Sequence, residues 1–342
     1  MEELGGKLLE AVSRSFYLTI RLLPEPLRGP LSLGYLLARA MDTVADSPAE
    51  SVPTATRLEH LRAMVEMIKY GTDPAALRPI QRDLAPLQKH AGERALLEKL
   101  DRCLGWLESL TPAADRWDLQ RALTRIAYGQ ELDLLRFGGS AEGEKTEVRA
   151  LQNAQELDDY TYYVAGSAGE LWTRLCSRHL PGYATLPQEE MLRLGRAFGQ
   201  GLQLVNVLRD VPGDLRLGRC YLPADELATA GVTSPANLLQ ERERVQPILR
   251  RWRLRAAERL DDAWRYVRAL RGKKLRYACT LPVLLGIRTL ALLAQAPALA
   301  EEKPVKVSRG GLRNIMFTAG IGMVAPPLTE AFYRRARRQA AA

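Results

Sequence analysis

Helical periodicity runs through almost the whole chain, and it is the feature that most limits the possible folds. Apolar residues recur every three or four positions in segments separated by Pro or Gly, whereas the alternation typical of a half-buried strand is nearly absent. The expected helical segments are 4–23, 27–46, 54–70, 73–90, 93–110, 113–137, 148–179, 188–211, 235–270 and 275–296. The pattern predicts an all-α protein, and 342 residues with 46% apolar content can bury a core as one domain over 1–342.

Two distant stretches carry aspartate pairs with DxxxD spacing, each preceded by an arginine. The first places a polar set within roughly 60° on a helix: Tyr35, Arg39, Asp42 and Asp46. The second places another set within roughly 80°: Gln203, Asn206, Asp210 and Asp214. Carboxylates at i and i+4 repel each other, so a helix gains nothing from them unless a cation lies between them. Pro212 predicts that the second helix bends or ends near Val211, before Asp214.

Helical carboxylate pairs supply the oxygen ligands that Mg²⁺ prefers when it bridges a protein to substrate phosphates. We therefore expect a magnesium site that holds two diphosphates through four residues: Asp42, Asp46, Asp210 and Asp214. Guanidinium groups suited to phosphate oxygens lie nearby in the sequence: Arg39, Arg209, Arg216 and Arg219. A solvated or salt-bridged helix face explains one such pair equally well, and the second copy in an apolar setting is what favours the metal site.

Loss of a diphosphate from an allylic carbon leaves a carbocation, so such a site needs an apolar cavity that excludes water. Aromatic rings can stabilise this cation without reacting with it. The candidates are Phe16, Tyr35, Tyr160, Tyr162, Tyr163 and Tyr266. Core packing alone explains each of these aromatic residues equally well when it is taken singly.

Composition and charge exclude several other classes of protein. The net charge of +9 is compatible with nucleic acid, an anionic membrane or a phosphorylated substrate, but the chain has no nucleic-acid-binding motif and only 6% aromatic residues. The four cysteines are scattered, which indicates reduced thiols rather than a disulfide framework or a zinc site. The N-terminal segment lacks the pattern of a signal peptide, so we expect a cytoplasmic protein.

Four ordered motifs resemble the squalene and phytoene synthase family of head-to-head prenyltransferases. They are SRSF at 13–16, YLLARAMDTVAD at 35–46, YTYYVAG at 160–166 and QLVNVLRD at 203–210. The resemblance runs from about residue 13 to residue 315 and implies an isoprenoid-synthase-type helical bundle around a central cavity. Two later segments, CTLPVLLGIRTLALL from Cys279 and VKVSRGG from Val305, are similar to the squalene synthase branch.

The resemblance also implies an activity. Two farnesyl diphosphates would condense to presqualene diphosphate, which would be ionised again, rearranged and reduced by NADPH. Tyr160 matches the tyrosine that steadies the first cation or helps to remove a proton. The substrate-binding positions implied are Phe16, Tyr35, Arg39, Gln203, Asn206, Arg209, Arg219 and Tyr266. The chain has no GxGxxG motif after a strand, so NADPH is assigned to Asn206, Lys306 and Arg309 by the resemblance alone. A solvated basic loop explains Lys306 and Arg309 equally well.

The sequence departs from the family at one aromatic position, where Ala278 stands before Cys279. This departure leaves open which side chain shields the second cation. Pocket depth, which sets the chain length of the substrate, is not encoded in these motifs, so other products of the family also stay open, namely hydroxysqualene, dehydrosqualene or phytoene. A helical assembly protein without catalysis is the alternative from another class, and it would be expected to lose its aspartates.

No span is expected near the C-terminus, because residues 315–324 are too few to cross a bilayer and two prolines follow them. The basic tail over 325–342, with FYRRARRQ, predicts weak, salt-sensitive contact with an anionic membrane or an ordinary soluble helix.

Overall fold

The computed structural model describes residues 3–13, 15–48, 51–138, 147–296, 305–323 and 325–342. These residues are almost all helical, so the all-α prediction is confirmed. Their contacts divide the chain into two compact units. Unit 1 contains Met1–Glu142 and Leu171–Pro181, and unit 2 contains Gly143–Glu170 and Gly182–Ala342. The expectation of one domain over 1–342 stays a prediction.

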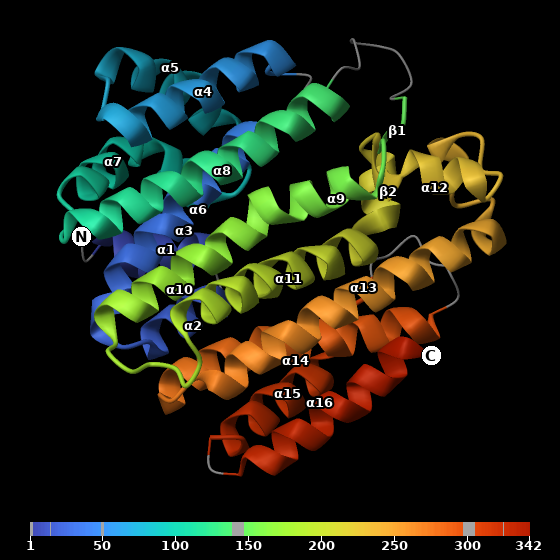
Figure 1. Ribbon diagram of the computed structural model, residues 1–342. Helices are drawn as coiled ribbons and strands as arrows, with labels where there is room; N and C mark the ends of the chain where they lie inside the picture. The colour runs from blue at the N-terminus through green and yellow to red at the C-terminus, as the bar shows by residue number, and fades with distance from the viewer. Residues whose placement is uncertain (1–2, 14, 49–50, 139–146, 297–304, 324) are drawn as a thin grey trace. The chain divides into compact units, whose positions relative to one another are not determined.

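Unit 1 is organised around α3 (Glu25–Ala45), which packs against α8 (Ala113–Phe137) and α4 (Thr54–Tyr70) (Figure 1). The buried face of α3 follows helical spacing: Leu33, Leu36, Leu37, Ala40, Met41 and Val44 are each fully buried. The other elements of this unit are η1 (Leu4–Leu8), α1 (Leu9–Ser13), α2 (Ser15–Leu22), α5 (Pro74–Leu84), η2 (Ala85–Leu87), α6 (Ala91–Glu98), α7 (Leu100–Glu108) and the C-terminal part of α10 (Ser167–His179).

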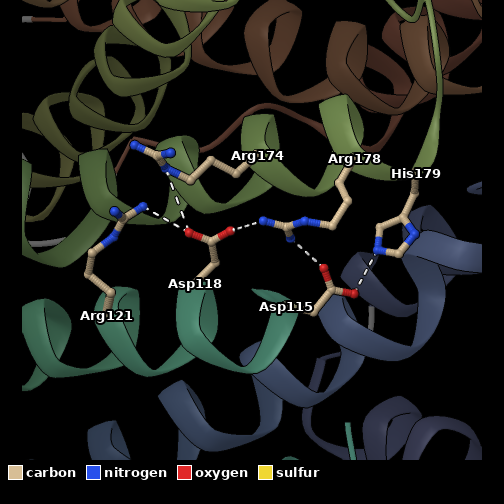
Figure 2. Close-up of polar contacts among 6 residues, drawn as sticks. All are labelled: Asp115, Asp118, Arg121, Arg174, Arg178 and His179. Carbon is tan, nitrogen blue, oxygen red and sulfur yellow. Dashed lines mark hydrogen bonds and ion pairs between the residues drawn. The ribbon is translucent and has the colours of Figure 1, made fainter. Parts of the chain in front are cut away.

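A network of buried charges joins α8 to the C-terminal part of α10 within unit 1 (Figure 2). Its two carboxylates, Asp115 and Asp118, are 0% and 3% exposed. Four cationic or ionisable side chains contact them: Arg121, Arg174, Arg178 and His179. Arg178 spans both carboxylates, with one guanidinium nitrogen 2.5 Å from Asp115 Oδ1 and another 2.5 Å from Asp118 Oδ2. Buried carboxylates need such partners, because an unpaired buried charge is strongly destabilising.

Unit 2 is organised around the long helix α11 (Gln188–Arg216), which packs against α13 (Arg242–Ala269) and α14 (Lys273–Gln295). Further along the chain, α15 (Arg309–Ile321) and α16 (Pro326–Ala341) pack on α14 and on each other (Figure 1). The remaining elements are β1 (Arg149–Leu151), α9 (Ala154–Thr161), η3 (Tyr162–Gly166), β2 (Arg219–Pro223), α12 (Ala224–Thr229) and η4 (Pro235–Asn237).

Helix α14 is the one described helix long and apolar enough to cross a membrane. More than half of its apolar window, 56%, is buried inside the structure. Since α14 also contacts α11, α13, α15 and α16, this burial is typical of a core helix.

Several of the expected helices, including 4–23, 73–90, 93–110 and 235–270, are divided in the structure, and two other differences bear on the candidate site. The prediction of one helix over 148–179 is wrong, because the segment begins with strand β1 and contains α9, η3 and α10. Asn153 starts α9 by accepting the backbone N–H of Glu156 at 3.1 Å. Strand β1 pairs in parallel with β2, in a register that places Arg149 beside Arg219. A strand of three residues is too short to leave a visible alternation in the sequence.

The second acidic helix was expected to bend or end near Val211. An end there is wrong, because α11 continues through Pro212 to Arg216, and a bend stays a prediction. Proline removes one backbone hydrogen bond and crowds the preceding turn. Here Leu208, Val211 and Leu215 are all buried on the same helix, and their packing outweighs that loss. Asp210 and Asp214 therefore belong to one continuous helix.

Candidate active site

The first aspartate pair lies at the C-terminal end of α3. Asp42 is in the last turn, and Asp46 is the residue at which the helix stops, with φ −90° and ψ 6°. The backbone N–H of Asp46 still donates to the carbonyl oxygen of Asp42 at 2.8 Å. Both carboxylates lie at the negative end of the helix dipole, which is unfavourable for an anion and favourable for a bound cation.

Asp42 has polar neighbours on three helices. Gln130 on α8 donates its side-chain N–H to Asp42 Oδ1, and Arg39 Nη1 lies 3.9 Å from Asp42 Oδ2. Arg39 also pairs with Glu93 on α6. The Asp42 side chain is partly buried, with 43% of it exposed. This burial raises the pKa of Asp42 to about 7, and the charge of Asp46 adds to the shift, while Arg39 and Gln130 oppose it. A bound cation would favour the ionised form of this carboxyl.

The oxygen atoms around Asp42 fit a magnesium ion. Within the described residues, no group of three or more His, Cys, Asp or Glu side chains is placed to hold a metal ion. However, Mg²⁺ needs only one or two carboxylates from the protein, because waters and substrate phosphates complete its shell. Gln130 Oε1 is buried and has no hydrogen-bond partner in the described structure. This oxygen is a hard donor on the same side chain that already contacts Asp42.

Tyr35 lies two turns before Asp42 on α3. Its hydroxyl donates to the backbone oxygen of Val12 at 3.3 Å. Burial raises the pKa of this phenol, so Tyr35 stays neutral in the physiological range. Its aromatic ring is half-buried on the helix that carries the first aspartate pair.

In unit 2, glycines bring the chain segment of Tyr160 against α11. A Cβ atom on Gly199 would lie 2.1 Å from the carbonyl oxygen of Ala165, and one on Gly169 would lie 2.0 Å from that of Gly195. No other residue allows these backbones to approach so closely. The same segment contains the π-helical turn η3, a distortion often found at functional sites.

This close approach places Tyr160 beside two polar side chains of α11. Gln203 Nε2 donates to the Tyr160 hydroxyl at 3.3 Å, and Asn206 Nδ2 donates to Gln203 Oε1 at 3.3 Å. The Tyr160 ring is stacked on Tyr221 of β2, with centroids 4.6 Å apart and planes 26° apart. The tyrosine is therefore held at both its hydroxyl and its ring face.

The second aspartate pair follows on the same helix. Arg209 donates two hydrogen bonds to Asp210, from Nε to Oδ1 at 2.9 Å and from Nη2 to Oδ2 at 2.5 Å. The bonds to Asp210 raise the pKa of Arg209, and the charge of Asp214 contributes to the same shift. Arg219 begins β2, which packs against α11. Unit 2 thus gathers Tyr160, both aspartates of the second pair and these two arginines around α11 and β2.

The other predicted residues lie as follows. Tyr266 on α13 is 1% exposed and packs edge-on against Phe198, with centroids 6.0 Å apart. Lys306 and Arg309 are exposed at the start of α15, where Ser308 caps the helix. The side chain of Phe16 lies outside the described residues. The first aspartate pair belongs to unit 1 and the second to unit 2, and their sharing of one cavity stays a prediction.

Sequence reasoning missed three residues of these clusters: Glu93, Gln130 and Tyr221. One signal for Gln130 was present, because it continues an apolar stripe of α8 that includes Leu119, Leu123 and Ile126. A polar residue in such a stripe must find a partner inside the protein. Glu93 and Tyr221 carried no comparable signal in the sequence.

Comparisons with known proteins agree with the motifs. The family model described as squalene/phytoene synthase matches residues 9–311. The chloroplastic phytoene synthase 1 of Zea mays is 29% identical over 233 residues, which are 67% of this chain and 45% of that protein. The probable squalene synthase of Neurospora crassa is 26% identical over 336 residues, which are 96% of this chain and 64% of that protein. The chain thus spans 45% to 64% of the length of these two curated relatives.

A solved complex of TcSQS with the ligand BPH1237 has a similar structure. The TM-score is 0.73, the sequence identity is 21%, and the match covers 99% of each chain. This likeness shows the fold, so the expected all-α isoprenoid-synthase fold is confirmed.

Proposed function

Because the chain belongs to the squalene/phytoene synthase family, we propose that it is a magnesium-dependent squalene synthase. In this proposal it joins two farnesyl diphosphates head to head into presqualene diphosphate, and then rearranges and reduces that product to squalene with NADPH. The observation that carries the proposal is the Asp42 carboxyl, which shares its surroundings with Asp46 and with the unpartnered oxygen of Gln130.

In the proposed mechanism the aspartate pairs hold the metal ions: Asp42, Asp46, Asp210 and Asp214. Bound Mg²⁺ supplies positive charge that stabilises the departing diphosphate. Arg39 and Arg209 each pair with an acidic neighbour in the structure, and their remaining N–H groups can donate to phosphate oxygens. Arg219 and Tyr35 complete the proposed set of diphosphate-binding groups.

Tyr160 is proposed to act on the first carbocation. The bond from Gln203 and the stack on Tyr221 fix the position of its ring and hydroxyl. An aromatic ring held in this way can face a cation, and its hydroxyl oxygen can accept a proton. Asn206 supports this arrangement by orienting Gln203.

Lys306, Arg309 and Asn206 are the residues proposed for NADPH. Lys306 and Arg309 are exposed and have no ion-pair partner in the described part of the chain, so their charges are available to a phosphate. A nicotinamide cofactor supplies hydride to the second carbocation, and the chain's part is to bind its phosphates and exclude water.

A second candidate function is a related synthase that ends at hydroxysqualene, dehydrosqualene or phytoene. The match to the phytoene synthase of Zea mays and the alanine at Ala278 both favour it. A non-catalytic assembly protein is the remaining alternative, and the retention of all four aspartates counts against it.

Product analysis tests these candidates. The protein is incubated with farnesyl diphosphate and Mg²⁺, with and without NADPH, and the hydrocarbons are identified. Squalene formed only with NADPH supports the proposal, whereas the same hydrocarbon in both reactions refutes the reductive step. Asp42→Ala and Asp210→Ala should each abolish turnover while the circular dichroism spectrum stays unchanged. Full activity in either variant would exclude the proposed metal site.

We also propose peripheral contact with the cytoplasmic face of an anionic membrane. In α15, Leu312, Met316 and Phe317 are 43%, 44% and 68% exposed, and Arg313 is exposed beside them. Exposed apolar side chains flanked by cations are typical of an interfacial helix. The tail over 325–342 is less available, since the Tyr333 ring is buried on Trp264.

A further inference from the structure

The middle of α13 borders a hollow of ≈ 760 Å³ within unit 2. Four arginines of this single helix line it: Arg250, Arg251, Arg253 and Arg255. The wall also includes Glu258 on the same helix and Ala294 near the end of α14. None of these residues has a part in the proposed reaction.

Two of the four arginines already have acidic partners. Arg251 Nη1 lies 3.3 Å from Glu226, and Arg255 Nε donates to Asp158 at 3.1 Å. Arg250 and Arg253 have no ion-pair partner in the ranges that the structure describes. Glu258, the one acidic side chain that lines the hollow, is exposed and pairs with neither of them, and the last residue, Ala342, also lines the hollow. Among the side chains that line the hollow, four cations therefore stand against one carboxylate.

Arg253 is the more informative of the two, because its side chain is buried and only 8% exposed. Its Nε donates to the backbone oxygen of Ala340 at 2.9 Å, which uses one of five N–H donors. Burial and the charge of Arg250 both lower the pKa of Arg253. A buried cation without an acidic side chain as its partner is costly, and an anion in the hollow would stabilise it.

We propose that this hollow binds a phosphate-class anion with at least two negative charges, held by Arg250 and Arg253. The two residues are three positions apart, so their side chains leave the same face of α13. A carboxylate would balance one guanidinium, whereas a phosphate dianion balances both and matches the planar fork of each. The volume exceeds that of inorganic phosphate, which leaves room for a soluble organic phosphate or a lipid phosphate headgroup.

Calorimetric titration of the full chain with inorganic diphosphate tests the proposal. EDTA is present throughout, so that metal-dependent binding at the aspartates is absent and the result does not depend on the proposed reaction. We expect saturable binding that Arg250→Ala weakens about tenfold or more, because it removes a charge-assisted hydrogen bond. Arg250→Lys should lose part of this affinity, since it keeps the charge and loses the fork. Arg268→Ala, an exposed change on the same helix outside the hollow, should leave binding unchanged.

A second arm distinguishes the two sources of phosphate. Phosphatidylcholine vesicles with and without phosphatidic acid are floated with each variant. Binding only to the phosphatidic acid vesicles, lost in Arg250→Ala and kept in Arg268→Ala, identifies a lipid headgroup. Binding to neither diphosphate nor these vesicles overturns the proposal, as does binding that Arg250→Ala leaves intact. Arg253→Gln, checked by thermal unfolding, must also weaken binding wherever it folds, and unchanged affinity would equally overturn the site.

Discussion

Gln130 donates a hydrogen bond to Asp42 from the neighbouring helix, and its own carbonyl oxygen is buried without a partner among the described residues. The amide thus supports the carboxylate with one atom and offers a metal ligand with the other. Gln130→Leu removes both while keeping a side chain of similar size. We expect turnover of farnesyl diphosphate to fall about tenfold or more, with a higher Mg²⁺ concentration needed for half-maximal rate.

The matched control for this prediction is Gln120→Leu on the same helix. Gln120 donates to the backbone oxygen of Ile68 at 2.7 Å and has no contact with either aspartate pair. Its loss should lower the melting temperature without changing the Mg²⁺ dependence. Equal Mg²⁺ dependence in both variants would show that the Gln130 oxygen has no role in metal binding.

The raised pKa of Asp42 predicts a specific pH dependence of stability. The folded state keeps this proton up to about pH 7, whereas the unfolded chain releases it near the ordinary value of 3.8. The folded state therefore binds more protons between these values, and its stability contribution falls as pH rises through that window. In EDTA, Asp42→Asn should lose this decline relative to the native chain. Thermal unfolding across the window measures the difference.

Mg²⁺ should reverse the effect, because it binds the ionised carboxylate. The rise in melting temperature on adding Mg²⁺ should be larger at pH 8 than at pH 6, and it should shrink in Asp42→Asn. An equal rise at both pH values in the native chain would contradict ion binding at this carboxylate.

Long, strongly periodic helices could be predicted from the sequence, because residues within or next to each segment determine them. The segments 54–70 and 113–137 coincide with α4 and α8, because their apolar spacing and flanking Pro or Gly determine both ends. Two failures had non-local causes. Helix α11 continues through Pro212 because side-chain packing stabilises it. Strand β1 forms because it pairs with β2, which lies about 70 residues later in the sequence.

The same distinction holds for the candidate site. Asp42, Asp210 and Tyr160 were identified because their residue types and spacing are written along single helices or motifs. The contacts of Gln130, Glu93 and Tyr221 depend on which helices and strands become neighbours, which periodicity does not encode. Gln203 was predicted only in part. Its place on the acidic face of the helix was expected from the sequence, but its hydrogen bond to Tyr160 was not.

Tyr160 offers a test that separates its hydroxyl from its ring. Tyr160→Phe keeps the stack on Tyr221 and removes the group that Gln203 contacts. If the hydroxyl takes part in proton removal, formation of presqualene diphosphate should slow by about 10² or more. Tyr333→Phe is the control, because it removes a hydroxyl bonded to Asp261 far along the chain and should leave the rate unchanged. If Tyr160→Phe kept the native rate, the hydroxyl would have no role in proton removal, and only the aromatic ring could act on the cation.

The membrane proposal places the contact on α15. Phe317→Ser removes the most exposed of its large apolar side chains and should reduce flotation with anionic vesicles at low salt. Arg338→Ala in the tail, an exposed cation on α16, should have a smaller effect. The opposite ranking would move the contact to the tail, and no flotation of the native chain would remove the proposal.

The charge network of unit 1 should stabilise the fold without affecting the chemistry (Figure 2). Arg178→Met leaves Asp115 and Asp118 buried without the side chain that spans them. Asp115 keeps His179, and Asp118 keeps Arg121 and Arg174. Because removing one partner from a buried charge network is still costly, we expect the free energy of unfolding in urea to fall by about 3 kcal/mol. Arg82→Met breaks an exposed pair with the adjacent Asp83 and should change that free energy by less than about 1 kcal/mol. A loss for Arg178→Met as small as that for Arg82→Met would contradict the stabilising role of the buried network.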